Sequence, residues 1–251
     1  MAVSEPLVLI HGLGGSKAVW DPVAPLLERE RQVIAVDMPG FGAAPSLPQG
    51  VEPTAANLGA AIAERLAEGG VERPHVAGNS LGAWVGLEMG RAGAAASVTA
   101  LSPAGLWRKP LGPGRHEFRA WARKLRPLVR AAVEVPALRR RMTSTFAFHP
   151  DRVPTETARE LIIGWVDANG YEGANRAMRT YLFDPADYPE DVPVTIAWGE
   201  HDRLVGPPKP HRRPAGTRFL VLPGVGHTPM WDDPELVAEA LLEGCAVATE
   251  T

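Results

Sequence analysis

Short apolar runs alternate with helical patterns along most of the chain, and this alternation restricts its fold more than any other feature. Residues 7–10 and 32–36 have the length and apolar content of buried strands, and a helical pattern over residues 22–31 separates them. A second helical pattern covers residues 54–68. Four further runs are strand candidates, at residues 74–77, 97–101, 194–198 and 219–222. Strands that alternate with helices in this way predict an α/β protein with a mainly parallel, doubly wound sheet.

The length of 251 residues suits one large α/β domain with a single insertion. Residues 105–190 interrupt the alternation, because they contain helical patterns but no strand candidate and are far longer than an ordinary connection. We therefore expect a core built from residues 1–104 and 191–251. Residues 105–190 are expected to form a helical cap over the sheet.

The cap segment contains many aromatic residues, which predicts an apolar pocket beneath it. Phe118, Trp121, Ala122 and Leu125 recur at helical spacing, and this spacing predicts a packed helix face. In a cap, a packed face and the roof of a pocket can coincide. The candidate substrate-binding residues are Trp107, Trp121, Phe146, Phe148, Tyr181, Phe183 and Met230.

Charge and cysteine content exclude several classes of function. The formal net charge is −3 and the isoelectric point is about 6.2, so no overall basic field favours nucleic acid or a membrane as a partner. A single cysteine, Cys245, excludes an internal disulfide, and no Cys/His cluster points to a metal ion or another cofactor. Residues 1–6 lack the features of a signal peptide, and no later stretch is long enough to span a bilayer. We expect a soluble cytoplasmic protein.

A serine lies between a strand candidate and a helical pattern, within the sequence Gly78-Asn79-Ser80-Leu81-Gly82. A serine on a very tight strand-to-helix turn has a strained backbone, and neighbouring glycines let the strand and the helix approach closely enough to hold it. Ser80 is therefore a candidate nucleophile.

A serine nucleophile requires a general base within hydrogen-bond reach, and the base requires an acid that fixes its tautomer. His227 is the candidate base, because it follows the strand candidate at 219–222 in a flexible Gly-Val-Gly-His loop. Asp202 is the candidate acid, and Glu200 is the alternative; both follow the strand candidate at 194–198. The chain order of serine, acid and histidine is the one that accompanies such a serine turn.

Five motifs together resemble the α/β-hydrolase superfamily: His11-Gly12-Leu13-Gly14-Gly15-Ser16, Asp37-Met38-Pro39-Gly40-Phe41-Gly42, the Ser80 turn, Gly199-Glu200-His201-Asp202 and Gly226-His227-Thr228-Pro229-Met230. The resemblance covers nearly the entire chain. It implies an oxyanion hole formed by the backbone N–H groups of Leu13 and Leu81. Members commonly have two further strands before the strand that precedes the His-Gly loop, whereas here that strand candidate begins at Leu7. We therefore expect a sheet of about six strands with residues 32–36 at an edge.

The serine nucleophile implies acyl-transfer chemistry, whereas the dehalogenases and epoxide hydrolases of the superfamily carry aspartate at this turn. Cleavage of a carboxylic ester is the prediction. Asn79 resembles the carbon–carbon hydrolases of the superfamily, although these usually have Trp where Thr228 stands. A thioester or lactone hydrolase, a cofactor-free perhydrolase or haloperoxidase, and a hydrolase-like receptor with little turnover would retain the same three residues, so these functions also stay open.

The two halves of the cap segment differ in charge. Residues 106–141 carry a net charge of +9 and residues 142–191 a net charge of −5, so the two halves are expected to neutralise each other. A row of like charges at i,i+4 spacing nevertheless remains, formed by Arg115, Arg119 and Arg123. Such a row destabilises a helix unless an anion neutralises it. One hypothesis is that an acyl carrier protein or an anionic acyl group docks there, as the resemblance to esterases with a basic cap implies.

Overall fold

The computed structural model describes residues 5–112 and 117–246, with only the backbone given for Glu117 and Phe118. Six strands form one entirely parallel sheet in the order β2-β1-β3-β4-β5-β6. Their bounds are β1 Leu7–Ile10, β2 Val33–Val36, β3 His75–Asn79, β4 Ser97–Leu101, β5 Val194–Gly199 and β6 Arg218–Leu222. The predicted sheet of about six parallel strands is confirmed, and β2 lies at an edge of the sheet as expected.

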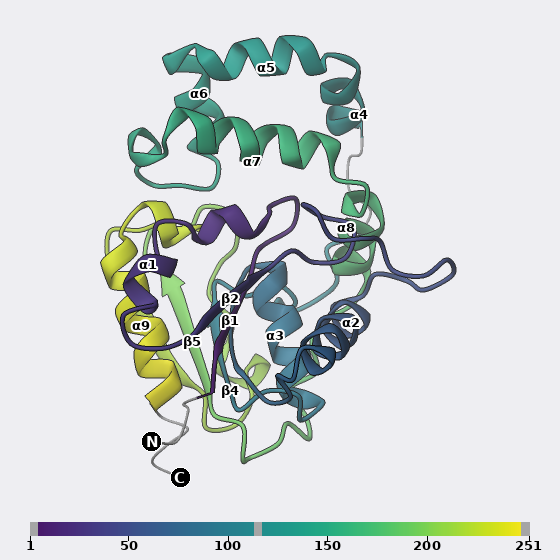
Figure 1. The fold of residues 1–251 in the computed structure, drawn as a ribbon, viewed down its shortest axis with the longest axis vertical. Helices are drawn as coiled ribbons and strands as arrows, with labels where there is room; N and C mark the ends of the chain where they lie inside the picture. Colours follow the sequence, from purple (N-terminus) through teal and green to yellow (C-terminus); the bar gives the residue numbers. More distant parts are fainter. Residues whose placement is uncertain (1–4, 113–116, 247–251) are drawn as a thin grey trace.

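Helices cover both faces of the sheet (Figure 1). Helices α2 (Ala55–Glu68) and α3 (Leu81–Arg91) pack against each other on one face, and α1 (Ala24–Leu27) and α9 (Pro234–Ala246) lie on the other. The four-residue α1 is shorter than the helix predicted over residues 22–31, because the chain turns back toward β2 after Leu27. A short 3₁₀ helix, Lys17–Trp20, precedes it.

Apolar side chains of each strand contribute to both faces of the sheet. In β1, Val8 and Ile10 join the core beneath α2 and α3, whereas Leu7 and Leu9 join the core beneath α9. Successive side chains of a strand point to opposite faces, so a strand covered on both sides is apolar throughout. This explains why the strand candidates are continuous apolar runs.

Glycines let α3 begin in contact with the strands. A Cβ atom on Gly82 would lie 2.3 Å from the carbonyl oxygens of Ile10 and His11, and one on Gly78 would lie 2.3 Å from the carbonyl oxygen of Gly82. Neither position can accept a side chain without separating the helix from the sheet. The close approach brings Ser80, between these two glycines, next to the end of β1.

Five helices lie between β4 and β5 in the described part of the chain: α4 Glu117–Lys124, α5 Arg126–Glu134, α6 Pro136–Thr143, α7 Thr155–Asp167 and α8 Tyr171–Thr180. Figure 1 shows α4 to α7 as a layer beyond the sheet, on the side toward which β5 points, with α8 between this layer and α2. The layer therefore covers the carboxyl ends of the strands, where α/β proteins place their sites. No helix among the described residues is long and apolar enough to cross a bilayer.

Candidate active site

Ser80 joins β3 to α3 in a strained backbone conformation, with φ 55° and ψ −113°. Residues other than glycine rarely adopt a positive φ, so the surrounding structure must hold Ser80 in this conformation. The N–H of Ser80 donates to the carbonyl oxygen of Leu101 (2.9 Å), and the Ser80 carbonyl accepts from the N–H groups of Trp84 (3.2 Å) and Ala104 (3.0 Å). These three hydrogen bonds fix the serine at the end of the sheet.

Asp202 and His227 form a hydrogen-bonded pair at the ends of β5 and β6. The distance between His227 Nδ1 and Asp202 Oδ2 is 2.7 Å, and both side chains are buried. Burial alone would raise the pKa of Asp202, but the hydrogen bond and charge of His227, with the N–H groups of Leu204 and Val205, hold that pKa below its usual value. The alternative acid, Glu200, accepts instead from the N–H of Gly224.

Asn79 links the histidine loop to the serine turn. Its side-chain amide donates to the carbonyl oxygen of His227 (2.8 Å) and to that of Leu101 (3.3 Å). Because Asp202 occupies Nδ1 of His227, Nε2 is the ring nitrogen that remains for another partner. The described hydrogen bonds include none between Ser80 Oγ and the imidazole, and in unliganded enzymes this contact is often long. This role of Asn79 was not predicted from the sequence, although a buried side-chain amide has to find partners.

The loop from Gly12 to Gly15 lies directly beside the serine. A Cβ atom on Gly12 would be 3.3 Å from the Cβ of Ser80. The N–H of Gly15 donates to the carbonyl oxygen of Gly12 (3.1 Å), across a turn in which Gly14 has a φ of 79°. Leu13 stands inside this turn, and Leu81 is the first residue of α3, where N–H groups have no acceptor within the helix. Both candidate oxyanion donors thus belong to segments that adjoin Ser80.

His11 fixes the orientation of the peptide group between Gly12 and Leu13. Its Nε2 accepts from the N–H of Met38 (3.0 Å), so the proton resides on Nδ1, which donates to the carbonyl oxygen of Gly12 (2.8 Å). In a trans peptide the C=O and the following N–H point in opposite directions. By holding the Gly12 oxygen, His11 therefore sets the direction of the Leu13 N–H.

Burial lowers the pKa of His11 to about 4, against smaller opposing effects of the Gly12 hydrogen bond and the Asp37 charge. The unfolded chain binds this proton below about pH 6.5, whereas the folded chain binds it only near pH 4. The free energy of unfolding should therefore fall by about 3 kcal/mol from this group as the pH decreases through that window. Urea denaturation at intervals between neutral pH and pH 4 would measure the decrease.

The matched variant is His11→Asn, which keeps a polar side chain but does not titrate. We expect its stability to depend less on pH than that of the wild type over the same window. Burial also lowers the pKa of His75, so some pH dependence remains in the variant. Identical pH profiles for the two proteins would show that His11 is not the group responsible.

Two aromatic residues of the cap cover the loop beside the serine. A Cβ atom on Gly14 would be 2.6 Å from Cδ1 of Trp165, in α7, and 3.3 Å from the ring of Tyr171, in α8. The two rings meet edge to face at 6.0 Å. Neither residue was predicted from the sequence, because nothing in their local pattern distinguishes them from other helix residues of the cap.

Arg119 holds these aromatic residues in place. Its guanidinium donates to the carbonyl oxygens of Trp165 (2.8 Å) and Ala168 (2.5 Å), pairs with Glu172 (2.5 Å) and lies 4.6 Å above the centre of the Tyr171 ring. The side chain is only 3% exposed. Arg119 therefore fastens the carboxyl end of α7 to α8 and does not face solvent.

The position of Arg119 bears on the predicted basic row. Arg115 lies outside the described residues, and Arg119 forms an ion pair with Glu172 within the chain. Arg123 is exposed and within 3.5 Å of the side chain of Asn169. Since Arg119 is buried, α4 does not present a row of three arginines to an external anion.

A short segment of the cap rests on the histidine loop. The N–H of Thr228 donates to the carbonyl oxygen of Phe146 (2.9 Å), and the Phe148 ring stacks on His201 at 4.0 Å between ring centres. Phe146 and Phe148 are partly buried. Of the candidate substrate-binding residues, these two contact residues next to Asp202 and His227 in the chain.

Asp232 connects this segment to the histidine loop. Its carboxylate accepts from the N–H groups of Gly226 (2.8 Å), Phe148 (3.0 Å) and His149 (2.6 Å), and its side chain is completely buried. Arg152 also donates to the Asp232 carbonyl oxygen. One carboxylate thus joins the residue before His227 to the cap.

The other candidate substrate-binding residues lie elsewhere. Trp121 is exposed on the outside of the cap, and Tyr181 is exposed with its hydroxyl donating to Glu52. Phe183 and Met230 are completely buried in the two cores of the molecule, so neither lines an open pocket in this structure. Trp107 is partly buried and packs edge to face on Trp84. Aromatic content alone did not separate pocket residues from core residues.

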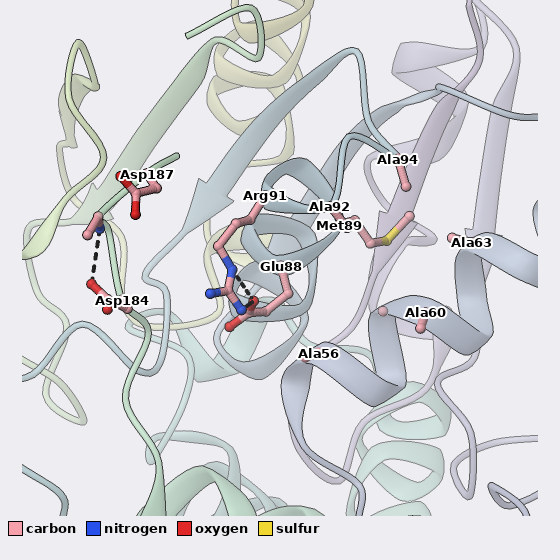
Figure 2. A pocket seen from close by; sticks show the side chains of 12 residues that line it. Ala56, Ala60, Ala63, Glu88, Met89, Arg91, Ala92, Ala94, Asp184 and Asp187 are labelled. Atoms are coloured by element: carbon pink, nitrogen blue, oxygen red, sulfur yellow. Dashed lines mark hydrogen bonds and ion pairs between the residues drawn. The ribbon is translucent and has the colours of Figure 1, made fainter. Parts of the chain in front are cut away.

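The hollow shown in Figure 2 is separate from this site. It has a volume of about 470 Å³ and lies between α2, α3 and the segment around Asp184 and Asp187. Alanines form much of its lining, and the ion pair of Glu88 and Arg91 (2.5 Å) lies at its wall. Ser80, Asp202 and His227 are not among its lining residues. No group of three or more His, Cys, Asp or Glu in the described ranges is arranged to hold a metal ion.

Fold and site together define a hydrolase built on a parallel α/β sheet. The chain belongs to the alpha/beta hydrolase family, whose sequence model matches residues 7–240. It is 31% identical over 193 residues to epoxide hydrolase EphH of Mycobacterium tuberculosis, covering 72% of this chain and 89% of the relative. It is 30% identical over 250 residues to a Shigella flexneri protein named "Putative carbamate hydrolase RutD", covering 96% and 91%.

A solved structure of a thermophilic esterase from Thermogutta terrifontis has the same fold. The TM-score is 0.70 at 21% sequence identity, and the match covers 98% of this chain and 91% of the esterase. At this identity the likeness concerns the fold alone. The names of the relatives refer to different bonds, epoxide in one and carbamate in the other, so they do not identify the bond that this protein cleaves.

Proposed function

We propose that this protein is a serine hydrolase that cleaves carboxylic esters through an acyl-enzyme on Ser80. The observation that carries the proposal is the backbone of Ser80, held at a positive φ at the start of α3 and in contact with the Gly12 loop. Such strain persists only where the surrounding structure over-determines it, and it is typical of catalytic nucleophiles. The hydrogen bond between His227 and Asp202 supports the same assignment.

Ser80 Oγ bonds to the ester carbonyl carbon while His227 Nε2 accepts the hydroxyl proton. Asp202 holds the imidazolium by its hydrogen bond to Nδ1. The N–H groups of Leu13 and Leu81 stabilise the oxyanion, and loss of one such donor typically costs about 2.7 to 4 kcal/mol. The proton then passes to the departing alkoxide as its bond to carbon breaks. Water repeats the sequence, which releases the acid and restores the serine.

Carbamate cleavage is the second candidate, and the 30% identity to the relative named for that activity favours it. A carbamate presents the same carbonyl to Ser80, so the same groups serve both reactions. Epoxide opening is not proposed despite the similarity to EphH, because the serine turn lacks the aspartate expected of that chemistry. Trp165 and Tyr171 lie at Gly14, and Phe148 stacks on His201; these apolar side chains favour an apolar substrate group.

A substrate panel with the purified wild-type protein tests the proposal. p-Nitrophenyl esters from acetate to decanoate, a p-nitrophenyl carbamate and styrene oxide would be compared at equal enzyme concentration. We expect repeated turnover of the esters with one preferred chain length, slower turnover of the carbamate and none of the epoxide. Repeated turnover also separates an esterase from a receptor that reacts once.

A covalent label identifies the nucleophile independently of the substrate. A fluorophosphonate should add to the peptide that contains Ser80 and abolish ester turnover, as measured by mass spectrometry and residual activity. A label on another residue, or ester turnover that survives complete labelling of Ser80, would refute the acyl-enzyme on this serine. Faster turnover of the carbamate than of every ester would select the second candidate.

A further inference from the structure

The helices of the cap expose large apolar side chains, and two of them, Trp121 and Leu125, had been predicted from helical spacing to be packed. On α4, Arg119 and Ala122 are buried, whereas Trp121 is 61% exposed. On α5, Val133 is completely buried and the helix packs on α7. Leu128 lies about 140° around the helix axis from Val133, and it is 65% exposed. Figure 1 shows α5 as the outermost element, with α7 between it and the sheet.

Exposed apolar side chains are concentrated in this part of the molecule. Of the ten large hydrophobic side chains that are exposed among the described residues, five lie within residues 121–138. Isolated exposed hydrophobic residues need no explanation, whereas a cluster of them marks an interaction surface. We define the outer cap face by Trp121, Leu125, Leu128, Val135 and Leu138, together with the cations Arg123, Lys124, Arg130 and Arg141.

The same segment is strongly cationic. Residues 119–143 contain eight Arg or Lys and a single acidic residue, Glu134. Three of the eight cations are paired within the chain: Arg119 with Glu172, Arg126 with Asp167 and Arg140 with Asp151. The four cations of the outer cap face form no ion pair in the described part of the chain. Glu134 pairs with Arg159, and its charge also acts on Arg130. Arg123, Lys124 and Arg141 are therefore the cations of this face that have no acidic partner among the described residues.

A cation of the outer cap face lies directly beside one of its exposed apolar side chains. Lys124 Nζ lies 5.4 Å from the centre of the Trp121 ring, so one of the most exposed apolar side chains carries a cation directly beside it. Helices with Trp and Leu beside Arg and Lys lie in the interface of an anionic lipid layer, with the apolar groups among the acyl chains and the cations at the headgroups.

We propose that the outer cap face binds the surface of an anionic lipid layer. A second copy of the chain would bring two like-charged faces together across a two-fold axis, which opposes association. An acidic protein would neutralise the charge, whereas an anionic lipid layer both neutralises the charge and takes up the exposed Trp121 and Leu128. The expectation of no membrane partner rested on the charge of the entire chain, in which this cationic face is cancelled by acidic residues elsewhere. The proposal does not depend on the chemistry at Ser80.

Sedimentation with lipid vesicles tests the proposal on the full-length protein. One vesicle preparation contains equimolar phosphatidylcholine and phosphatidylglycerol, and the other contains phosphatidylcholine alone. We expect the protein to partition onto the anionic vesicles at least about tenfold more strongly, and added salt to reduce this partition because it screens the charges. Equal partition onto both vesicle types, or none onto either, would overturn the proposal.

Variants of the outer cap face have matched controls elsewhere on the surface. Leu128→Ser and Arg130→Gln should each weaken binding to the anionic vesicles several-fold, since they remove one apolar and one cationic contact. Leu204→Ser and Lys209→Gln change exposed residues outside the cap segment, and they should leave binding to the anionic vesicles unchanged. Unchanged thermal unfolding of the face variants would establish that they fold. If face and control variants lost binding equally, the outer cap face would not be the binding surface.

Two other binding partners of the outer cap face would give different results. If a subunit contact covers the face, the wild type should be a dimer by analytical ultracentrifugation, and Leu128→Ser should dissociate it. If an acidic protein covers it, purified acyl carrier protein should bind in a pull-down that Arg130→Gln weakens, while the anionic vesicles bind no protein. Either result would overturn the proposal for a lipid layer.

Discussion

Replacing Ser80 with alanine is expected to lower kcat for the best p-nitrophenyl ester by about 10⁴- to 10⁶-fold, the loss that follows removal of a serine nucleophile from a working triad. The remaining groups of the site stay in place, so KM should change little. The protein should also keep its stability, because alanine at a φ of 55° is strained in the same way as serine. Steady-state kinetics and urea denaturation measure the two effects.

Ser80→Gly is the matched control for the backbone. It also lacks the nucleophile and should be equally inactive. Glycine tolerates a positive φ, so its free energy of unfolding should exceed that of Ser80→Ala by about 1 kcal/mol. If Ser80→Ala retained more than a small fraction of the wild-type kcat, another residue would be the nucleophile. If both variants had the same stability, the strain at this turn would be absent in solution.

Replacing Asp232 with alanine is expected to reduce both activity and stability. The N–H groups of Gly226, Phe148 and His149 would each lose an acceptor within a buried region. An unsatisfied buried donor costs about 1–3 kcal/mol, so the free energy of unfolding should fall by roughly 4 kcal/mol in total. The loop that carries His227 would also lose its attachment to the cap, and even a small displacement of a catalytic group lowers kcat by about 10²-fold.

The neighbouring aspartate provides the control. The carboxylate of Asp233 accepts from the N–H of Leu236 at the start of α9, and asparagine caps a helix about as well as aspartate. Asp233→Asn should therefore retain wild-type kcat and stability, whereas Asp232→Asn should lie between Asp232→Ala and the wild type. Thermal unfolding and ester kinetics would be measured for all three. Unaltered kcat in Asp232→Ala, measured below its unfolding temperature, would show that Asp232 supports only the fold.

The sheet could be predicted from the sequence because its strands are local features. Continuous apolar runs identify strands that are covered on both faces, and β1 and β4 have the predicted bounds. The pairing of Asp202 with His227 could be predicted for a related reason, since each of the two follows a predicted strand. The carboxyl ends of parallel strands meet at one edge of the sheet. Their proximity was therefore implied by the strand assignment before any contact was known.

The surroundings of the site could not be predicted in this way. Trp165 and Tyr171 reach Gly14 only because Arg119, many residues earlier, fastens α7 to α8. No pattern within a helix encodes such a contact. The same limit explains why Phe183 and Trp121 were expected in the pocket: an aromatic side chain has the same local signal in a core, on a surface and in a pocket.

The attachment through Asp232 restricts how a substrate can enter. The cap segment at Phe148 and His149 shares one carboxylate with Gly226, the residue before His227. If the cap lifted at this end to form an entrance, it would pull the histidine loop along and separate the imidazole from Asp202. An entrance at this end would thus be open only while the hydrogen bond between His227 and Asp202 is broken. We therefore expect this end of the cap to stay fixed and substrate to enter at another side of the cap.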